Sequence, residues 1–209
     1  MNKNIIWIAS YPKSGNTWIR SILCSLFYTK DGSYSFEDLK NIYLFDSPHN
    51  YYFLKELNKQ LYDKLNEIEI ISKYRIKAQQ LYNEKNEVRF FKTHSANINF
   101  KNYPYTNEKL TKGVIYIVRD PRDIAISYSE HFKISIEETI TKLQKEDNIM
   151  LTSNKSRYIT FLSRWDYHIA SWEKINVPKL FIRYEDLIEK PIQTTIQIIL
   201  FIKNNLKVD

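Results

Sequence analysis

Residues 5–20 have the sequence IIWIASYPKSGNTWIR, and this stretch decides the fold. Its first five residues are apolar, which is typical of a strand buried on both faces, and a Tyr-Pro pair ends the run. From Trp18 onward apolar residues recur every three to four positions, which predicts a helix. A strand, a short polar turn and a helix leave backbone N–H groups free where the helix begins, and Lys13 adds a positive charge. We therefore predict that the turn at residues 13–17 binds an anion such as phosphate or sulfate.

The composition of the chain indicates one globular domain covering residues 1–209. Hydrophobic residues make up 43% of the chain, which is enough for a sizeable core. The net charge of +7 comes from scattered Lys and Arg residues, so an acidic small ligand is favoured over nucleic acid as partner. The single cysteine, Cys24, excludes a disulfide within the chain, and no stretch resembles a signal peptide or a membrane span of ~20 apolar residues. We therefore expect a cytoplasmic protein.

Three further apolar runs predict strands, at residues 88–93, 114–118 and 178–182. Helical patterns lie between these strands, so the expected fold class is α/β, with a parallel sheet flanked by helices on both faces. In such sheets ligands bind beyond the carboxyl ends of the strands. The residues that follow the four strands are Lys13, His94, Arg119 and Tyr184. We expect all four at one edge of the sheet.

Helical spacing is found within residues 55–84, which a break near Ser72 divides in two, and over residues 157–175. A capping box of Ser135 and Glu138 opens another helix. Pro191 opens the last helix, whose inward face is expected at Ile192, Ile196, Ile199 and Leu200. Residues 28–54 and 96–113 are predicted to be irregular and exposed. Residues 148–156 are polar and are predicted to be mobile.

Residues 11–18, YPKSGNTW, resemble the 5′-phosphosulfate loop of the sulfotransferases that use 3′-phosphoadenosine 5′-phosphosulfate (PAPS), although that family usually has threonine in place of Asn16. The loop differs from a Walker A sequence, in which the lysine directly follows the last glycine. The resemblance implies that Lys13 stabilises the leaving group and that Trp18 lies against the adenine. The residues it implies for the 5′-phosphate are Ser14, Gly15, Asn16 and Thr17. The alternative is a basic turn without a ligand.

Residues 119–127, RDPRDIAIS, are similar to the 3′-phosphate motif of the same family, an arginine followed eight positions later by a serine. The resemblance assigns Arg119 and Ser127 to the 3′-phosphate, whose geometry an arginine fork matches. The alternative is an ion pair of Arg119 with Asp120 or Asp123. Residues 183–187, RYEDL, resemble a further family segment whose tyrosine reaches the nucleotide, which implies that Tyr184 binds the cofactor.

Residues 91–94, FKTH, match the Lys-Thr-His segment that carries the family's general base. A histidine titrates near neutral pH, as a base for the acceptor proton should, and the resemblance implies this role for His94. His131 is the competing candidate. Lys92 could help to neutralise the sulfuryl group, and His168 is interpreted as structural.

The resemblance therefore predicts a sulfotransferase with a three-layer fold similar to that of P-loop NTPases. It would move the sulfuryl group of PAPS to a hydroxyl or amine of a small-molecule or carbohydrate acceptor, leaving adenosine 3′,5′-bisphosphate (PAP), without a metal. The sequence ends at Asp209 without the Arg-Lys-Gly segment that usually closes over the 3′-phosphate, so we expect a domain lacking that segment. One alternative is a P-loop kinase, which would require Gly-Lys-Ser/Thr and an acid that holds Mg²⁺. The other is a non-catalytic nucleotide-binding or interaction protein.

Overall fold

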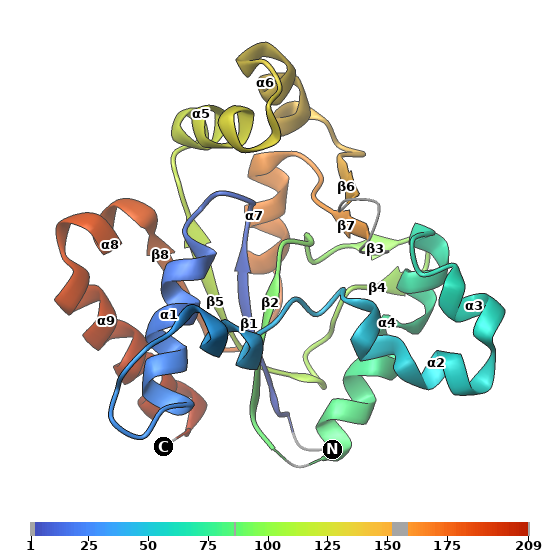
Figure 1. Cartoon of the computed structure of the whole chain (residues 1–209), viewed down its shortest axis with the longest axis horizontal. Helices are drawn as coiled ribbons and strands as arrows, with labels where there is room; N and C mark the ends of the chain where they lie inside the picture. The colour runs from blue at the N-terminus through green and yellow to red at the C-terminus, as the bar shows by residue number, and fades with distance from the viewer. Residues whose placement is uncertain (1–2, 86, 152–158, 209) are drawn as a thin grey trace.

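Four parallel strands form the central sheet of the computed structural model, which describes residues 3–85, 87–151 and 159–208 (Figure 1). The strand order is β2-β1-β5-β8, so β1 lies between β2 and β5. Their bounds are β1 Ile5–Ser10, β2 Arg89–Thr93, β5 Thr111–Val118 and β8 Lys179–Arg183. Every neighbouring pair is parallel, which confirms the predicted sheet, and β5 begins three residues earlier than predicted.

Strand β1 is buried along its whole length and contributes to two hydrophobic clusters. Ile5, Trp7 and Ala9 belong to one cluster, and Ile6 and Ile8 belong to the other. Successive side chains of a strand point to opposite faces, so both faces of the sheet are covered.

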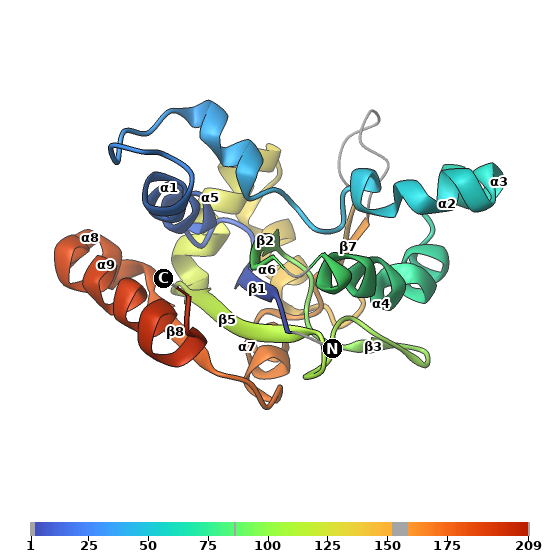
Figure 2. The same ribbon diagram turned by 90° about the horizontal axis from the view of Figure 1, so that it is seen from below.

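The helices cover the two faces in separate layers (Figure 2). Helices α1 (Asn16–Phe27) and α9 (Pro191–Leu200) pack on the face of Ile6 and Ile8. Helices α4 (Ile68–Glu84) and α7 (Trp165–Glu173) pack on the face of Trp7. The three-layer architecture predicted from the sequence is therefore confirmed.

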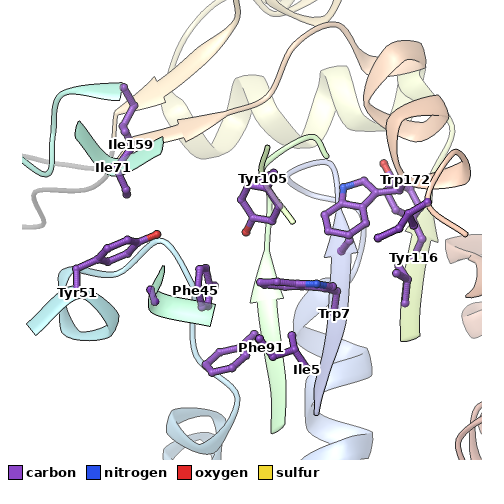
Figure 3. Packing of buried hydrophobic residues seen from close by; sticks show 14 of the residues in the cluster. Ile5, Trp7, Phe45, Tyr51, Ile71, Phe91, Tyr105, Tyr116, Ile159 and Trp172 are labelled. Atoms are coloured by element: carbon purple, nitrogen blue, oxygen red, sulfur yellow. The ribbon is translucent and has the colours of Figure 1, made fainter. Parts of the chain in front are cut away.

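The face of Trp7 carries a cluster of aromatic rings (Figure 3). The Trp7 ring centroid lies 5.0 Å from that of Phe45, 5.4 Å from that of Tyr105 and 6.0 Å from that of Trp172. Aromatic pairs at such distances add about 0.5–1.5 kcal/mol each beyond the area they bury. The Trp7 indole N–H also donates to Thr111 Oγ1 at 3.1 Å. The cluster fixes the positions of β1, β2 and α7 relative to one another.

The remaining elements are short. The helices are α2 (Tyr52–Leu57), α3 (Lys59–Asp63), α5 (Pro121–Phe132), α6 (Ile136–Gln144) and α8 (Tyr184–Glu189), with 3₁₀ turns η1 (Phe36–Asn41) and η2 (Pro48–Tyr51) and a π-helical turn η3 (Phe201–Asn205). Two hairpins pair β3 (Asn99–Phe100) with β4 (Tyr103–Pro104) and β6 (Ile149–Leu151) with β7 (Ile159–Phe161). Segments 28–54 and 96–113, predicted to be irregular, therefore contain short elements. Within the described residues no helix combines the length and apolarity needed to cross a bilayer.

Two predictions about helix boundaries are wrong. Ser72 lies inside α4, and the helical segment is instead interrupted at Asn58 and again over residues 64–67. The Asn58 side chain caps α3 by accepting the Leu61 N–H. Helix α7 begins at Trp165 rather than near residue 157, because residues 159–161 form β7 and Ser163 adopts a left-handed conformation (φ 57°). Residues 152–158, which cover most of the segment predicted to be mobile, lie outside the described residues.

The predicted inward face of the last helix is also wrong. Ile192 and Ile196 are 70% and 50% exposed, whereas Thr194 and Ile198 are buried. Apolar residues occur on nearly every side of α9, so their spacing does not determine which side faces the sheet. Ser135 does cap α6 as predicted, by accepting the Glu138 N–H at 3.1 Å.

Candidate active site

A cavity of about 770 Å³ opens at the carboxyl end of the sheet. Most of the residues predicted for the site line it. They are Lys13, Gly15, Asn16, Thr17, His94, Arg119, Ser127 and Tyr184. Ser14 and Trp18 do not line the cavity, although Ser14 is buried inside the same loop and Trp18 packs against Tyr184. Loops that are distant in sequence therefore meet at one place.

The loop between β1 and α1 presents free backbone N–H groups. Lys13 (φ 68°) and Gly15 (φ 92°) both adopt left-handed conformations, which turn the chain sharply before α1. The helix begins at Asn16 without a side-chain cap, so its first N–H groups have no side-chain partner. These groups, the helix dipole and the Lys13 ammonium favour an anion at this point.

The side chain of Asn16 is engaged within the protein. Its amide nitrogen donates to the Ile8 carbonyl at 3.0 Å and to Ser10 Oγ at 3.2 Å. The side-chain donor is therefore directed into β1, which leaves the backbone N–H of Asn16 as the group for an anion. Ser14 Oγ is buried without a hydrogen-bond partner among the described residues.

Arg119 connects the two loops that carry the predicted phosphate sites. Its Nη1 donates to the Lys13 carbonyl at 2.8 Å, and its guanidinium lies 4.3 Å from the centroid of the Tyr184 ring. Its Nε is buried and has no partner among the described residues. Asp120 bonds Arg122 instead, and no ion pair of Arg119 with Asp123 is found in the described part of the chain. The alternative pairing of Arg119 is therefore wrong.

Tyr184 packs closely on the first loop. A Cβ atom at Gly15 would lie 2.5 Å from the Tyr184 ring, so only glycine allows this approach. The ring of Trp18 meets Tyr184 edge to face at a centroid distance of 6.4 Å. Tyr184 therefore holds the loop and Arg119 in one arrangement.

The tautomer of His94 follows from its hydrogen bond. Its Nδ1 lies 2.8 Å from the carbonyl oxygen of Ser10, and because a carbonyl only accepts, Nδ1 carries the proton. Burial and the positive charge of Lys92 lower the pKa of His94 well below 6.5, so the ring is neutral at pH 7. No described residue bonds Nε2, which therefore offers a lone pair. This is the state that a general base requires.

Two more basic groups line the same cavity, Lys92 and His131. Burial and the charges of Arg20 and Lys13 lower the pKa of Lys92 to about 8. Lys92 therefore stays mostly charged at neutral pH. His131 is exposed at the end of α5, so both histidines considered for the base reach one cavity.

Sequence reasoning named none of the apolar residues that line the site and did not identify the residue that anchors His94. Leu44, Phe132 and Met150 supply apolar lining to the cavity, and two of them come from segments predicted to be irregular. Ser10 holds His94, and its only sequence signal is its position as the polar last residue of a buried strand. Among the described residues no three His, Cys, Asp or Glu side chains are grouped closely enough to hold a metal ion.

Comparison with known proteins shows sequence relatives along the chain. The family described as Sulfotransferase domain matches residues 3–209. Flavonol 3-sulfotransferase from Flaveria bidentis is 25% identical over 197 residues, which cover 90% of this chain and 53% of that protein. Cytosolic sulfotransferase 7 from Arabidopsis thaliana is 26% identical over 193 residues, which cover 89% of this chain and 52% of that protein. The chain thus spans about half the length of these curated relatives.

The fold also has a match among solved structures. The crystal structure of mouse sulfotransferase SULT7A1 complexed with PAP superposes with a TM-score of 0.56 at 20% identity, covering 100% of this chain and 61% of that chain. At this level of identity the match supports the fold alone. The family match extends over nearly the whole sequence, and the chain therefore belongs to the sulfotransferase domain family.

Proposed function

We propose that this chain transfers the sulfuryl group of PAPS to a hydroxyl or amine of an acceptor and leaves PAP. The observation that carries the proposal is the cavity, where the uncapped start of α1 and the partly unpaired Arg119 lie together with a neutral histidine. Membership of the sulfotransferase domain family supports it.

The unpaired polar atoms fit a nucleotide that carries phosphate at both the 5′ and the 3′ position. Lys13 and the N–H groups of residues 14–17 would hold the 5′ end, where the helix begins without a cap. Arg119, whose Nε lacks a partner, and Ser127 would bind the 3′-phosphate. Trp18 and Tyr184 present rings beside the loop and would contact the adenine.

The transfer that we propose requires one base and one stabilising cation. When bound, PAPS supplies a sulfuryl group joined through oxygen to its 5′-phosphate. His94 would take the acceptor proton at Nε2 while the acceptor oxygen bonds to sulfur and the bond from sulfur to the phosphate oxygen breaks. Lys13 would stabilise the negative charge that develops on that oxygen, a contribution worth about 10²–10³ in rate for donors of this kind. Lys92 would neutralise the sulfuryl oxygens, and no metal is needed.

We assign the base to His94 rather than to His131. The Ser10 carbonyl fixes the proton of His94 on Nδ1, and burial keeps its ring neutral. His131 lies exposed at the end of α5 and has no comparable anchor among the described hydrogen bonds.

The acceptor would lie against Leu44, Phe132 and Met150, which line the cavity with His94. This apolar wall fits a small molecule or the apolar face of a carbohydrate.

Two relatives are named cytosolic sulfotransferases, and we propose the cytoplasm as the compartment of this chain as well.

The proposal is tested by incubating the chain with PAPS labelled in the sulfuryl group and a panel of phenols, sugars and lipid alcohols. We expect the label to move to at least one acceptor class and PAP to form in equal amount. PAPS should raise the melting temperature, whereas ATP with Mg²⁺ should not, in contrast to a kinase. Tight PAP binding without transfer to any acceptor would support the non-catalytic alternative.

A further inference from the structure

Helix α7 holds the backbone of the segment that carries His94. Three side chains on one side of the helix, at spacings of three and four residues, bond this segment. The bonds are His168 Nε2 to the His94 carbonyl (3.0 Å), the Asn97 N–H to Ser171 Oγ (2.9 Å) and Trp172 Nε1 to the Ser95 carbonyl (3.1 Å). Strand β2 ends at Thr93, so beyond this residue the bonds from α7 hold the backbone in place of the hydrogen bonds of the sheet.

The direction of the bond from His168 follows from its partners. The His94 carbonyl only accepts, so the proton of His168 lies on Nε2. Burial lowers the pKa of His168 to about 4, so the ring is neutral and Nδ1 has a lone pair. The Tyr116 hydroxyl lies 2.7 Å from Nδ1 and must therefore donate to it. Tyr116 thus fixes the tautomer that lets His168 reach His94.

His94 is consequently held at two points, its ring and its backbone carbonyl. Ser10 on β1 holds its ring, and His168 on α7 holds its backbone carbonyl. Without the second anchor the backbone at His94 would lose its bond to α7, and the contacts of Nδ1 with the carbonyl and Oγ of Ser10 would have to hold the ring in place. A misplacement of about 1 Å at a reacting group can cost about 10²-fold in rate.

We propose that His168 is a positioning residue for the general base His94, acting through the bond of its Nε2–H to the His94 carbonyl. The inference rests on the proposed function, because it concerns the residue assigned there as the base. His168 itself does not line the cavity, so it does not touch the acceptor or the nucleotide.

Two substitutions at this position separate positioning from simple structural support. In His168→Gln the amide nitrogen can replace Nε2 and bond the His94 carbonyl, while the bond from Tyr116 is lost. In His168→Asn the shorter side chain can accept from Tyr116 but cannot reach His94. Each variant loses one buried hydrogen bond, so we expect similar decreases in melting temperature.

We expect kcat to fall about 10- to 100-fold in His168→Asn and to stay within about threefold of wild type in His168→Gln. KM for PAPS should change by less than about twofold in both variants. Equal losses of kcat in the two variants would overturn the inference, and so would a loss confined to KM.

A measurement on the free chain separates this inference from the proposed function. NMR of the chain labelled with ¹⁵N-histidine should show the neutral Nε2–H form of His168 and the neutral Nδ1–H form of His94 at pH 7. An Nδ1–H form of His168 would overturn the inference even in an active enzyme. A wild-type chain that transfers no sulfuryl group would instead overturn the proposed function, while the tautomers would still decide how His168 contacts His94.

Discussion

The two regions that meet at the end of β1 differ in how completely their polar groups are paired. In the anion loop, residues 13–17 with Arg119, buried polar atoms are left without partners and the helix lacks a cap. In the base segment, residues 94–97, bonds from β1 and α7 hold successive groups, and the Nε2 of His94 is left free. The first region offers many donors to a charged ligand, and the second holds one atom in a defined place.

The unpaired polar groups of the anion loop lower the stability of the folded chain, but they are available to bind a ligand. A buried polar group without a partner destabilises the folded state by about 1–3 kcal/mol. A ligand that bonds these groups offsets that cost and stabilises the folded chain by an amount that rises with the logarithm of its concentration. Ser10 joins the two regions, because it accepts from Asn16 and from His94. The side chain of Asn16 and the backbone carbonyl of Ser10 therefore connect the anion loop, through β1, to the residue proposed as the base.

The base segment has a second support in a buried ion pair. Ser95 Oγ donates to Asp46 at 3.0 Å, and Asp46 accepts from Arg75 Nε at 3.2 Å. Burial raises the pKa of Asp46, and the Arg75 guanidinium offsets part of this rise. Tyr105 bonds Thr93 at 2.6 Å, one residue before the base.

The largest effect is expected from removing the base. His94→Ala should lower kcat by about 10²–10⁴, the usual contribution of a general base, with PAP affinity changed by less than about threefold. Rapid-quench assays and calorimetry would measure the two quantities. His131→Ala, made in the same cavity, should lower kcat much less. A reversed ranking would move the base to His131 and remove the contrast between the regions.

The next largest effect, on the free energy of unfolding, is expected from breaking the buried ion pair that supports the base segment. Arg75→Met leaves Asp46 buried without its cation and should lower the free energy of unfolding by about 3–5 kcal/mol. Arg164→Met breaks a pair with Asp166 in which both side chains are exposed, and should cost less than about 1 kcal/mol. Urea unfolding measures both, and equal losses would contradict the role given to the buried pair.

The two buried histidines predict a pH dependence of stability. Both His94 and His168 have a lowered pKa in the folded chain, so the unfolded chain binds protons first as the pH falls. Stability should be full above pH ~6.5 and fall toward pH ~4, by up to about 1.4 kcal/mol per pH unit for each histidine. The slope between pH 6.5 and 5 should be about half as steep in His168→Gln. A flat profile in the wild type would contradict the buried, neutral state of both rings.

A smaller effect tests the contact of Tyr184 with the anion loop. Gly15 and Gly32 both have positive φ, but a Cβ at Gly32 would meet no atom within 4 Å. Gly32→Ala should therefore lose about 1 kcal/mol of stability from backbone strain alone. Gly15→Ala should add to that loss a weakening of PAP binding by about tenfold, because the Tyr184 ring must move from beneath Arg119. Unchanged PAP affinity in Gly15→Ala would show that Tyr184 does not shape the site.

The sequence predicted the elements whose residues have only one plausible environment. An apolar strand, a tight polar turn and a periodic helix in residues 5–20 lead directly to β1, the anion loop and α1. The parallel sheet then brings His94 and Arg119 to the same edge, because side chains after parallel strands meet there.

The predictions were wrong where a local sequence pattern is compatible with two different structures. The prediction of the inward side of α9 was wrong because apolar residues surround the helix. Packing on the sheet, which the local pattern does not contain, determines that Ile198 is buried. The start of α7 was wrong because Ile159 and Phe161 fit a strand as well as a helix. The anchors of His94 could not be predicted, since Ser10 and His168 lie 84 and 74 residues away along the chain.

The most direct test of the central claim is a calorimetric titration of PAP and of AMP, which lacks the 3′-phosphate, into the wild-type chain and into Arg119→Ala. An arginine that bonds a phosphate with charge-assisted hydrogen bonds should make PAP bind the wild type at least about tenfold more tightly than AMP does. We predict that Arg119→Ala removes this difference and weakens AMP binding less than PAP binding, although AMP binding also falls because Arg119 bonds the Lys13 carbonyl in the loop for the 5′-phosphate. Equal binding of PAP and AMP to the wild type would contradict the account.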